Sequence, residues 1–258
     1  MIHADFELAR RVESAEASIA SGCAGDRPGT AILEVAGGVA VFAGAESPTT
    51  EAIAIGLNGP VSPAEIDRLE SFFRSRGARV SIDLCPLADP GLLEQLGSRA
   101  YRPAEFNCVL VRRLTGDEFQ PARHARRILP EEAERWCRTV GLGFFEQPDL
   151  SQEEMDVGRA ICSMPGALCY LASAEDGEAR AGGAMAVHQR LATLFADSTT
   201  VPYRRRGFQR ELITARLKEA LAQGCDLAAA MVAPGSASQR NYERAGFQVA
   251  YTKILLVG

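Results

Sequence analysis

The sequence predicts an α/β fold with a mixed sheet. Apolar runs of strand length alternate along the chain with segments in which apolar residues recur every three or four positions. The clearest case is the apolar run 191–196, followed by a basic turn with one glycine and then a helical pattern over 208–223. The chain has 258 residues, of which 47% are hydrophobic and 24% charged, a globular composition that suits one large domain or two smaller ones.

The first half contains the turn and helix-start signals that separate alternating helices and strands. Apolar residues spaced three and four apart between Leu8 and Ile19 predict a helix, Gly37-Gly38 predicts a hairpin turn, and Ser62-Pro63 is a helix-start signal. The predicted elements are, in order, a helix over 5–20, a hairpin over 31–43, a strand over 52–57, a helix from residue 62, a strand over 80–84, a helix over 90–96 and a strand over 106–111.

The second half begins after a polar stretch, 115–127, which has no clear period and which we interpret as a linker. We therefore predict domains at 1–114 and 128–258. Ser151-x-x-Glu154 is typical of a capping box, and the nearly uninterrupted apolar run 226–233 indicates a central strand. The predicted elements are helices from residues 130 and 151, strands over 169–174, 181–187 and 191–196, a helix over 208–223, a strand over 226–233, a helix over 235–244 and a strand over 247–257.

Charge and terminal pattern exclude several classes of protein. The formal net charge is −5 and the sequence pI about 5.4, which argues against a broad surface for nucleic acid or anionic membranes but leaves room for one local basic site. No apolar run approaches the length of a membrane span, and the N-terminus lacks a signal-peptide pattern. We expect a cytoplasmic protein with neither a nucleic-acid nor a membrane partner.

The cysteines and histidines do not indicate a metal site. The seven cysteines are scattered without a Cys-x-x-Cys pair, and the three histidines lie far apart in the sequence. Reduced cysteines in the core fit this pattern better than disulfides. We therefore predict no metal.

The turn Arg204-Arg205-Arg206-Gly207 has the properties of an anion-binding site. The first turn of a helix carries backbone N–H groups that lack intrahelical acceptors and lie at the positive end of the helix dipole. Gly207 allows the backbone to approach a ligand closely, and the three arginines add charge that suits phosphate. The alternative from these residues alone is a solvated basic turn.

Arg204-x-x-Gly207-x-Gln209 resembles the pyrophosphate loop of the GNAT superfamily of acyl-CoA N-acyltransferases, whose pattern is Gln/Arg-x-x-Gly-x-Gly/Ala. Gln209 departs from this pattern and is compatible with it if only its backbone N–H is needed. The resemblance implies that the CoA phosphates bind the N–H groups of residues 205–209 and that the pantetheine arm pairs with the preceding strand end. The cofactor-binding residues implied are Thr199, Thr200, Val201, Arg204, Arg205, Arg206, Gly207, Phe208, Gln209 and Asn241.

A second motif, Asn241-Tyr242-Glu243-Arg244-Ala245-Gly246-Phe247, is similar to the C-terminal GNAT signature Tyr-Glu-Lys/Arg-x-Gly-Phe. The two motifs occur in the family's order, and the resemblance covers residues 126–258. It implies that Tyr242 protonates the departing CoA thiolate, because a thiolate leaving group needs a proton donor. The alternative for Tyr242 is a helix residue packed near the sheet edge.

The two halves resemble each other at their ends. Each half ends with the same order of elements: a helix, a glycine, a strand, a helix and a last strand. The glycine and the strand after it are Gly77 and 80–84 in the first half, and Gly224 and 227–232 in the second. The first half has Leu57-Asn58-Gly59-Pro60-Val61 where the second has its arginine turn. We expect two GNAT-like halves, with a degenerate N-terminal unit and a complete C-terminal unit.

The resemblance implies an N-acetyltransferase in which an amine of a small molecule or protein directly attacks acetyl-CoA. Val201 is the family-like donor to the developing oxyanion. Glu146, Asp197 and His188 remain open as the base. The acidic balance mildly favours a cationic amine, and the sequence is compatible with a monomer or a homodimer.

Two alternatives remain. A non-catalytic acyl-CoA-binding sensor or interaction module is compatible with Gln209 and with the lack of an identifiable base. A nucleotide-binding protein is weaker, because the Gly-x-x-x-x-Gly-Lys-Ser/Thr pattern is absent from the sequence.

Overall fold

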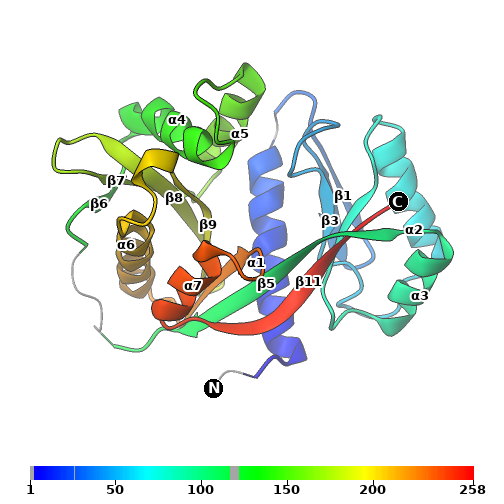
Figure 1. Cartoon of the computed structure of the whole chain (residues 1–258). Coiled ribbons are helices and arrows are strands. Elements are labelled where there is room, and N and C mark those ends of the chain that lie inside the picture. Colours follow the sequence, from blue (N-terminus) through cyan, green and yellow to red (C-terminus); the bar gives the residue numbers. More distant parts are fainter. Residues whose placement is uncertain (1–2, 26, 117–121) are drawn as a thin grey trace. The chain divides into compact units, whose positions relative to one another are not determined.

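The computed structural model describes residues 3–25, 27–116 and 122–258, and its ribbon is drawn in Figure 1. These residues form two compact units. Unit 1 spans Met1–Val109 together with Val249–Gly258, and unit 2 spans Leu110–Gln248. The chain thus passes into unit 2 within one strand and returns to unit 1 for its last strand.

Unit 1 contains helices capped by short polar side chains. The Asp5 carboxylate caps α1, accepting from the Leu8 N–H at 2.8 Å, and Ser62 and Glu65 form a capping box at α2. The elements are α1 (Phe6–Ala24), β1 (Ala31–Val35), β2 (Gly38–Phe42), β3 (Glu51–Ile53), α2 (Pro63–Arg74), β4 (Ser81–Leu84), α3 (Pro90–Ser98) and β11 (Gln248–Val257), with the first part of β5 (Arg102–Arg113).

The core of unit 1 lies between its strands and the helices α2 and α3. Phe73, Ile82 and Leu92 are each fully buried there. Figure 1 shows α1 on the other side of these strands. The unit therefore has helices on both faces of its strands, the α/β arrangement that the alternating sequence pattern predicts.

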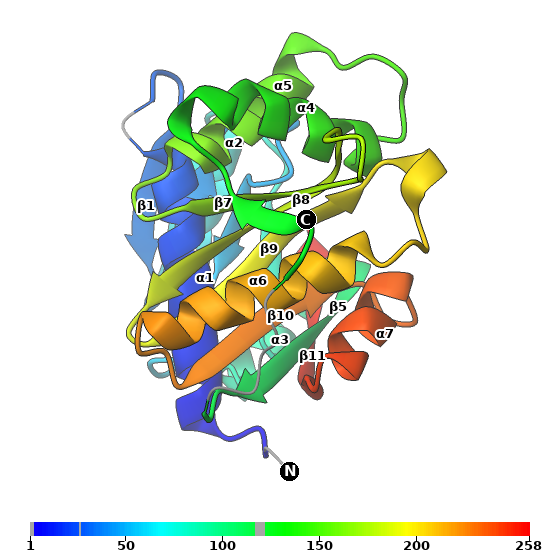
Figure 2. The same ribbon diagram turned by 90° about the vertical axis from the view of Figure 1, so that its left-hand side faces the viewer.

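Unit 2 is built around one buried tryptophan. The Trp136 indole N–H donates to the carbonyls of Tyr170 at 3.0 Å and Gly183 at 3.2 Å, which fixes α4 on the strands below it. Figures 1 and 2 show α4 and α5 over one face of β7, β8 and β9, with α6 on the opposite face. The elements are β6 (Ala125–Arg127), η1 (Pro130–Glu132), α4 (Ala133–Phe144), α5 (Gln152–Ser163), β7 (Leu168–Ser173), β8 (Ala179–His188), β9 (Leu191–Thr199), η2 (Val201–Tyr203), α6 (Phe208–Ala222), β10 (Leu227–Val232) and α7 (Ala237–Arg244).

The strand order explains how the two units repeat. In unit 1 the hydrogen-bonded order is β1-β2-β3-β4-β11-β5, and in unit 2 it is β5-β10-β9-β8-β7-β6. In each unit two antiparallel pairs are followed by a parallel pair joined by a helix: β3 and β4 through α2, and β9 and β10 through α6. The series β1-β2-β3-α2-β4-α3-β5 therefore recurs as β7-β8-β9-α6-β10-α7-β11. The apolar run at 226–233 forms β10, which has neighbours on both sides, as its pattern predicts.

The compact units differ from the predicted division at residues 114 and 128. The last strand belongs to unit 1, because β11 pairs there with β4, with Ile254 opposite Leu84. The stretch 115–127, predicted as a linker, ends in β6, which pairs with β7; residues 117–121 lie outside the described part of the chain. Strand pairing between distant segments leaves no local sequence signal, and a three-residue strand leaves almost none.

The described helices include none with the length and apolarity that crossing a bilayer requires. The same residues contain no group of three or more His, Cys, Asp or Glu side chains arranged to hold a metal ion. None of the seven cysteines, all of which lie in the described part of the chain, forms a disulfide, and all but Cys162 are buried.

Unit 1 also buries a cluster of charged side chains. The Lys253 ammonium is fully buried and pairs with Glu13 at 2.9 Å, Glu16 at 2.5 Å and Asp83 at 2.6 Å. The Tyr251 hydroxyl donates to Glu13 at 2.8 Å. Burial favours the neutral amine, but the three carboxylates outweigh it and raise the pKa of Lys253 well above its usual range.

We expect this cluster to make the protein less stable as the pH rises from 5 to 8.5. Burial raises the pKa of Glu16 to about 7. Burial, together with the charges of Asp83 and Glu16, also raises the pKa of Glu51, the first residue of β3, to about 8. Both groups titrate near about 4.3 when unfolded. The stability contributed by these raised pKa values is fully present below the unfolded pKa. It is lost as the pH rises through the folded value, because over this interval folding requires protons that the unfolded state has already released. Across this range the free energy of unfolding, measured in urea, should fall by more than about 1 kcal/mol. Glu51→Gln should make this fall smaller. A free energy of unfolding that rises with pH would contradict the raised pKa values as the cause.

Candidate active site

The strands β9 and β10 of unit 2 separate at the end where the arginine turn lies. Their parallel pairing runs from Leu191 opposite Leu227 to Leu194 opposite Ala230 and no farther in the described register, although β9 continues to Thr199. The last residues of β9 therefore lack a β10 partner on that edge. An unpaired strand edge offers backbone N–H and C=O groups to an extended ligand.

A bulge in β9 lies just beyond the point of separation. Ala184 pairs with Phe195 and Gly182 with Ser198, so two residues of β9 oppose one of β8. Ala196 in this bulge has a φ of 54°, the left-handed region. A bulge of this kind redirects a side chain, and here it places the carboxyl group of the next residue, Asp197, in the interior.

The arginine turn leads directly into α6 without a side-chain cap. Gly207, the N-cap residue, has a φ of 89°, and Arg205 a φ of 65°. No described atom lies within 4 Å of the position that a Cβ on Gly207 would take. The space beside Gly207 is thus open, and no side chain caps the start of α6.

The three arginines point in different directions. Arg204 donates to the Glu146 carboxylate and to the Gly143 carbonyl, each at 2.7 Å, so its guanidinium is held against the end of α4. The Arg206 guanidinium lies 5.0 Å from the centre of the Tyr203 ring. Arg205 is exposed. The charge near the turn available to a ligand therefore comes from Arg205 and Arg206.

Gln209, the departure from the loop pattern, joins α6 to α7. Its side-chain amide donates to the Ser238 hydroxyl at 2.7 Å, and its oxygen accepts from Asn241 at 2.7 Å. The side chain is thus directed to α7, and the backbone N–H of Gln209 stays in the first turn of α6. Asn241, predicted to contact the cofactor, donates to Gln209 in this structure.

Tyr242 is buried in a polar triad. The residue is 1% exposed. Its hydroxyl donates to one carboxylate oxygen of Asp197, and the other oxygen of Asp197 accepts from Arg216. Arg216 is itself fully buried and donates to the carbonyls of Ala184 at 2.8 Å and Leu212 at 3.0 Å. Burial, together with the Asp197 charge, raises the pKa of Tyr242 well above its usual range, so the phenol stays protonated.

The three candidate bases occupy very different places. Both oxygens of Asp197 are engaged in the triad. His188 pairs with Leu191 at the far end of the β8–β9 hairpin, six positions from Gly182 and so about 20 Å along the strand from the arginine turn. Glu146 is exposed, pairs with Arg204 and lines a cavity beside the turn.

This cavity has a volume of about 540 Å³ and lies within unit 2. Its walls come from one face of α4, the loop after α4, the start of β8 and the stretch from Thr200 to Tyr203. A volume of this size suits a small organic ligand. The sequence carries no signal for the lining residues Arg138 and Arg180, because an arginine on a helix face or at a strand end is typical of solvated surface.

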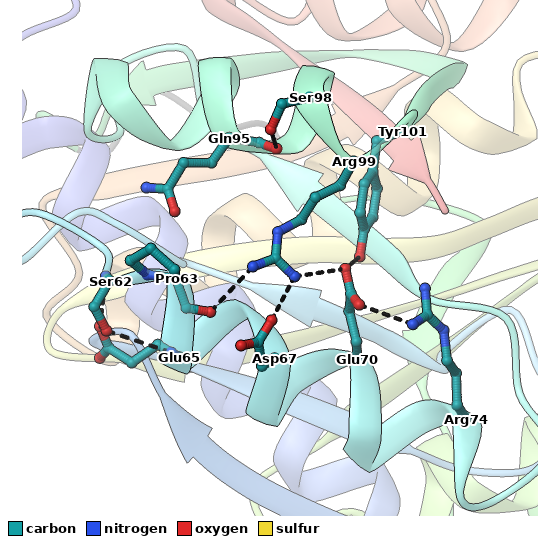
Figure 3. Close-up of polar contacts among 10 residues, drawn as sticks. All are labelled: Ser62, Pro63, Glu65, Asp67, Glu70, Arg74, Gln95, Ser98, Arg99 and Tyr101. Atoms are coloured by element: carbon teal, nitrogen blue, oxygen red, sulfur yellow. Dashed lines mark hydrogen bonds and ion pairs between the residues drawn. The ribbon is translucent and has the colours of Figure 1, made fainter.

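The corresponding loop of unit 1 is closed to phosphate by its own side chains. Figure 3 shows Ser62, Pro63 and Glu65 at the start of α2. The Glu65 N–H donates to the Ser62 hydroxyl, the Ser62 N–H donates to the Glu65 carboxylate at 2.9 Å, and Asp89 accepts from the Val61 N–H at 3.2 Å. One hydroxyl and two carboxylates therefore accept from N–H groups at the start of α2, whereas no side chain caps the start of α6.

No protein-family model matches the sequence, and no curated protein does. The fold is nevertheless shared with several solved structures. A GCN5-related N-acetyltransferase from Kribbella flavida matches 97% of this chain and 95% of its own, with a TM-score of 0.71 and 20% identity. A GCN5-related N-acetyltransferase from Sphaerobacter thermophilus matches 89% of this chain and 75% of its own, with a TM-score of 0.60 and 15% identity.

A tandem GNAT protein from the clavulanic acid biosynthesis pathway also matches. The similarity covers 99% of this chain and 96% of that one, with a TM-score of 0.59 and 13% identity. Coverage of nearly the whole chain by a tandem protein agrees with the repeated order of elements. The chain therefore has the fold of the GCN5-related N-acetyltransferases, as the two motifs around Gly207 and Tyr242 predict.

Proposed function

We propose that the protein transfers an acetyl group from acetyl-CoA to an amine. The observation that carries this proposal is the uncapped start of α6 behind the separated ends of β9 and β10. The phosphates of CoA bind the N–H groups of residues 205–209, and the pantetheine arm lies along Thr199, Thr200 and Val201. Unit 1 does not bind CoA, because its equivalent donors are already capped.

The reaction is direct attack by the amine. The nitrogen lone pair forms a bond to the acetyl carbon, the carbon–sulfur bond breaks, and CoA leaves as a thiolate that takes up a proton. The nitrogen loses one proton in return. Glu146 accepts that proton, since it is the one of the three candidate bases that lines the cavity. The Val201 N–H stabilises the oxyanion, and Tyr242 supplies the proton to sulfur.

Calorimetric titration with acetyl-CoA tests the cofactor assignment first. We expect acetyl-CoA to bind, and free adenosine diphosphate to bind much more weakly because it lacks the pantetheine arm. A folded sample without acetyl-CoA binding would mean that the arginine turn is only a solvated basic turn.

Tyr242→Phe is expected to lower kcat by about 10²- to 10⁴-fold, the usual contribution of a positioned acid, while the Kd for acetyl-CoA changes little. The variant also deprives Asp197 of one donor, so its stability must be measured. Tyr170→Phe is the matched control, because Tyr170 is a buried tyrosine of the same unit whose hydroxyl has no hydrogen-bond partner among the described residues. Equal kcat values for the two variants would remove Tyr242 from the mechanism.

A non-catalytic acyl-CoA sensor is the second candidate, and one observation favours it. The Tyr242 hydroxyl is turned toward Asp197 and is buried, so it is not presented to a ligand in this conformation. Acetyl-CoA binding without turnover of any amine in a broad panel would establish the sensor instead of the enzyme.

A further inference from the structure

The cavity beside the arginine turn is lined by both charged and apolar side chains. Its α4 wall is one helix face, because Arg138, Thr139 and Leu142 lie three, four and seven positions after Arg135 and all four residues line the cavity. Opposite them lies the stretch Thr200–Tyr203, which in the proposed function borders the pantetheine arm.

Most charges of the lining are already compensated. Glu146 pairs with Arg204 at 2.7 Å. Arg135 lies 3.7 Å from Glu178 and donates to the Gly177 carbonyl. Arg180 pairs with Asp176, at 2.5 Å.

Arg138 is different. It is exposed and lines the cavity, and within the described residues no carboxylate pairs with it. Arg180, which also lines the cavity, has a buried Nε without a hydrogen-bond acceptor among the described residues, and its guanidinium lies 4.1 Å from the centre of the Tyr203 ring. The cavity therefore carries uncompensated positive charge at its Arg138 end, despite the acidic balance of the whole chain.

We propose that the acceptor amine carries a carboxylate, which binds Arg138 while the amine lies at the Glu146 end of the cavity. This inference rests on the proposed acetyltransferase function and replaces the expectation of a purely cationic amine. A planar guanidinium matches one carboxylate in two parallel hydrogen bonds. Arg138 lies six positions before the end of α4 at Phe144, about 9 Å of helix rise, and Glu146 follows two residues later, so short peptides and amino acids have the right range of lengths.

The test compares matched acceptors. Glycine, β-alanine, diglycine and triglycine are offered with acetyl-CoA, each beside its C-terminal amide, and CoA release is measured. For at least one pair, wild type should have a kcat/KM about 10- to 100-fold higher for the carboxylate than for the amide. Arg138→Gln should remove that preference through a rise in KM, with the Kd for acetyl-CoA unchanged.

Arg68→Gln is the control variant, because Arg68 is an exposed arginine on a helix of unit 1 and its loss changes the net charge equally. It should keep the preference. The proposal would be overturned by equal kcat/KM values for acids and amides, or by turnover of neither set. A weaker affinity of Arg138→Gln for acetyl-CoA would overturn it as well. Failure of wild type to bind acetyl-CoA would instead overturn the proposed function, so the two failures are distinguishable.

Discussion

Gly207→Val is expected to raise the Kd for acetyl-CoA by at least about 100-fold, or ~2.7 kcal/mol. The wild-type residue has a φ of 89°, which costs a residue with a side chain about 1–2 kcal/mol. Valine either keeps this conformation, and then its side chain fills the open space that the phosphates need, or turns to a negative φ and redirects the N–H groups of the first turn of α6. Both responses remove donors from the anion site.

The fold should survive this change. A Cβ at Gly207 meets no described atom within 4 Å, so the substitution adds strain without a clash. Gly224→Val is the matched control: Gly224 follows the other end of α6, has a φ of 74° and is equally open. The two variants should lose similar stability in urea, whereas only Gly207→Val should lose binding by calorimetry. Equal affinities in the two variants would show that the phosphates bind elsewhere.

The arginine turn illustrates what the sequence can predict. A strand, a glycine turn and a helix follow one another within a few residues, so local propensity and spacing determine them. The same holds for the capping box at Ser151, which caps α5 in the structure. The proposed function of the turn rests on chemistry that is equally local: an uncapped helix start and a glycine at positive φ.

The triad of Arg216, Asp197 and Tyr242 illustrates what the sequence cannot predict. The charge of an arginine favours a solvated position, yet Arg216 is fully buried. Its burial depends on a carboxylate brought in by a bulge in β9 and on carbonyls of neighbouring elements. Such pairing depends on distances between residues far apart in the chain, and a buried charge is tolerated only with partners of this kind. The direction of the Gln209 side chain, toward α7, is tertiary information of the same type.

The buried cluster around Lys253 was likewise missed, because its lysine comes from the last strand and two of its carboxylates from the first helix. In this cluster a single ammonium faces Glu13, Glu16 and Asp83. Removing one partner from a buried ion pair leaves the others uncompensated in a medium of low dielectric. Loss of the ammonium is therefore expected to destabilise unit 1.

Lys253→Met is expected to lower the free energy of unfolding by about 3–5 kcal/mol near pH 7.5, the cost of leaving a buried charge unpaired. The loss should shrink toward pH 5.5, because there the carboxyl groups left without a cation become protonated and no longer carry buried charge. Lys218→Met removes an exposed lysine on α6 and should be nearly neutral at both pH values.

Two signals locate the effect of Lys253→Met in the chain. Trp136, the tryptophan of the sequence, reports on unit 2 by fluorescence, whereas far-ultraviolet circular dichroism reports on all helices and strands. If the units unfold separately, the variant should shift only part of the dichroism transition and leave the Trp136 transition in place. If they unfold together, both transitions should shift equally. If Lys253→Met lowers the free energy of unfolding equally at pH 5.5 and 7.5, the methionine acts through packing. The contact with Lys253 then does not keep the three carboxyl groups ionised.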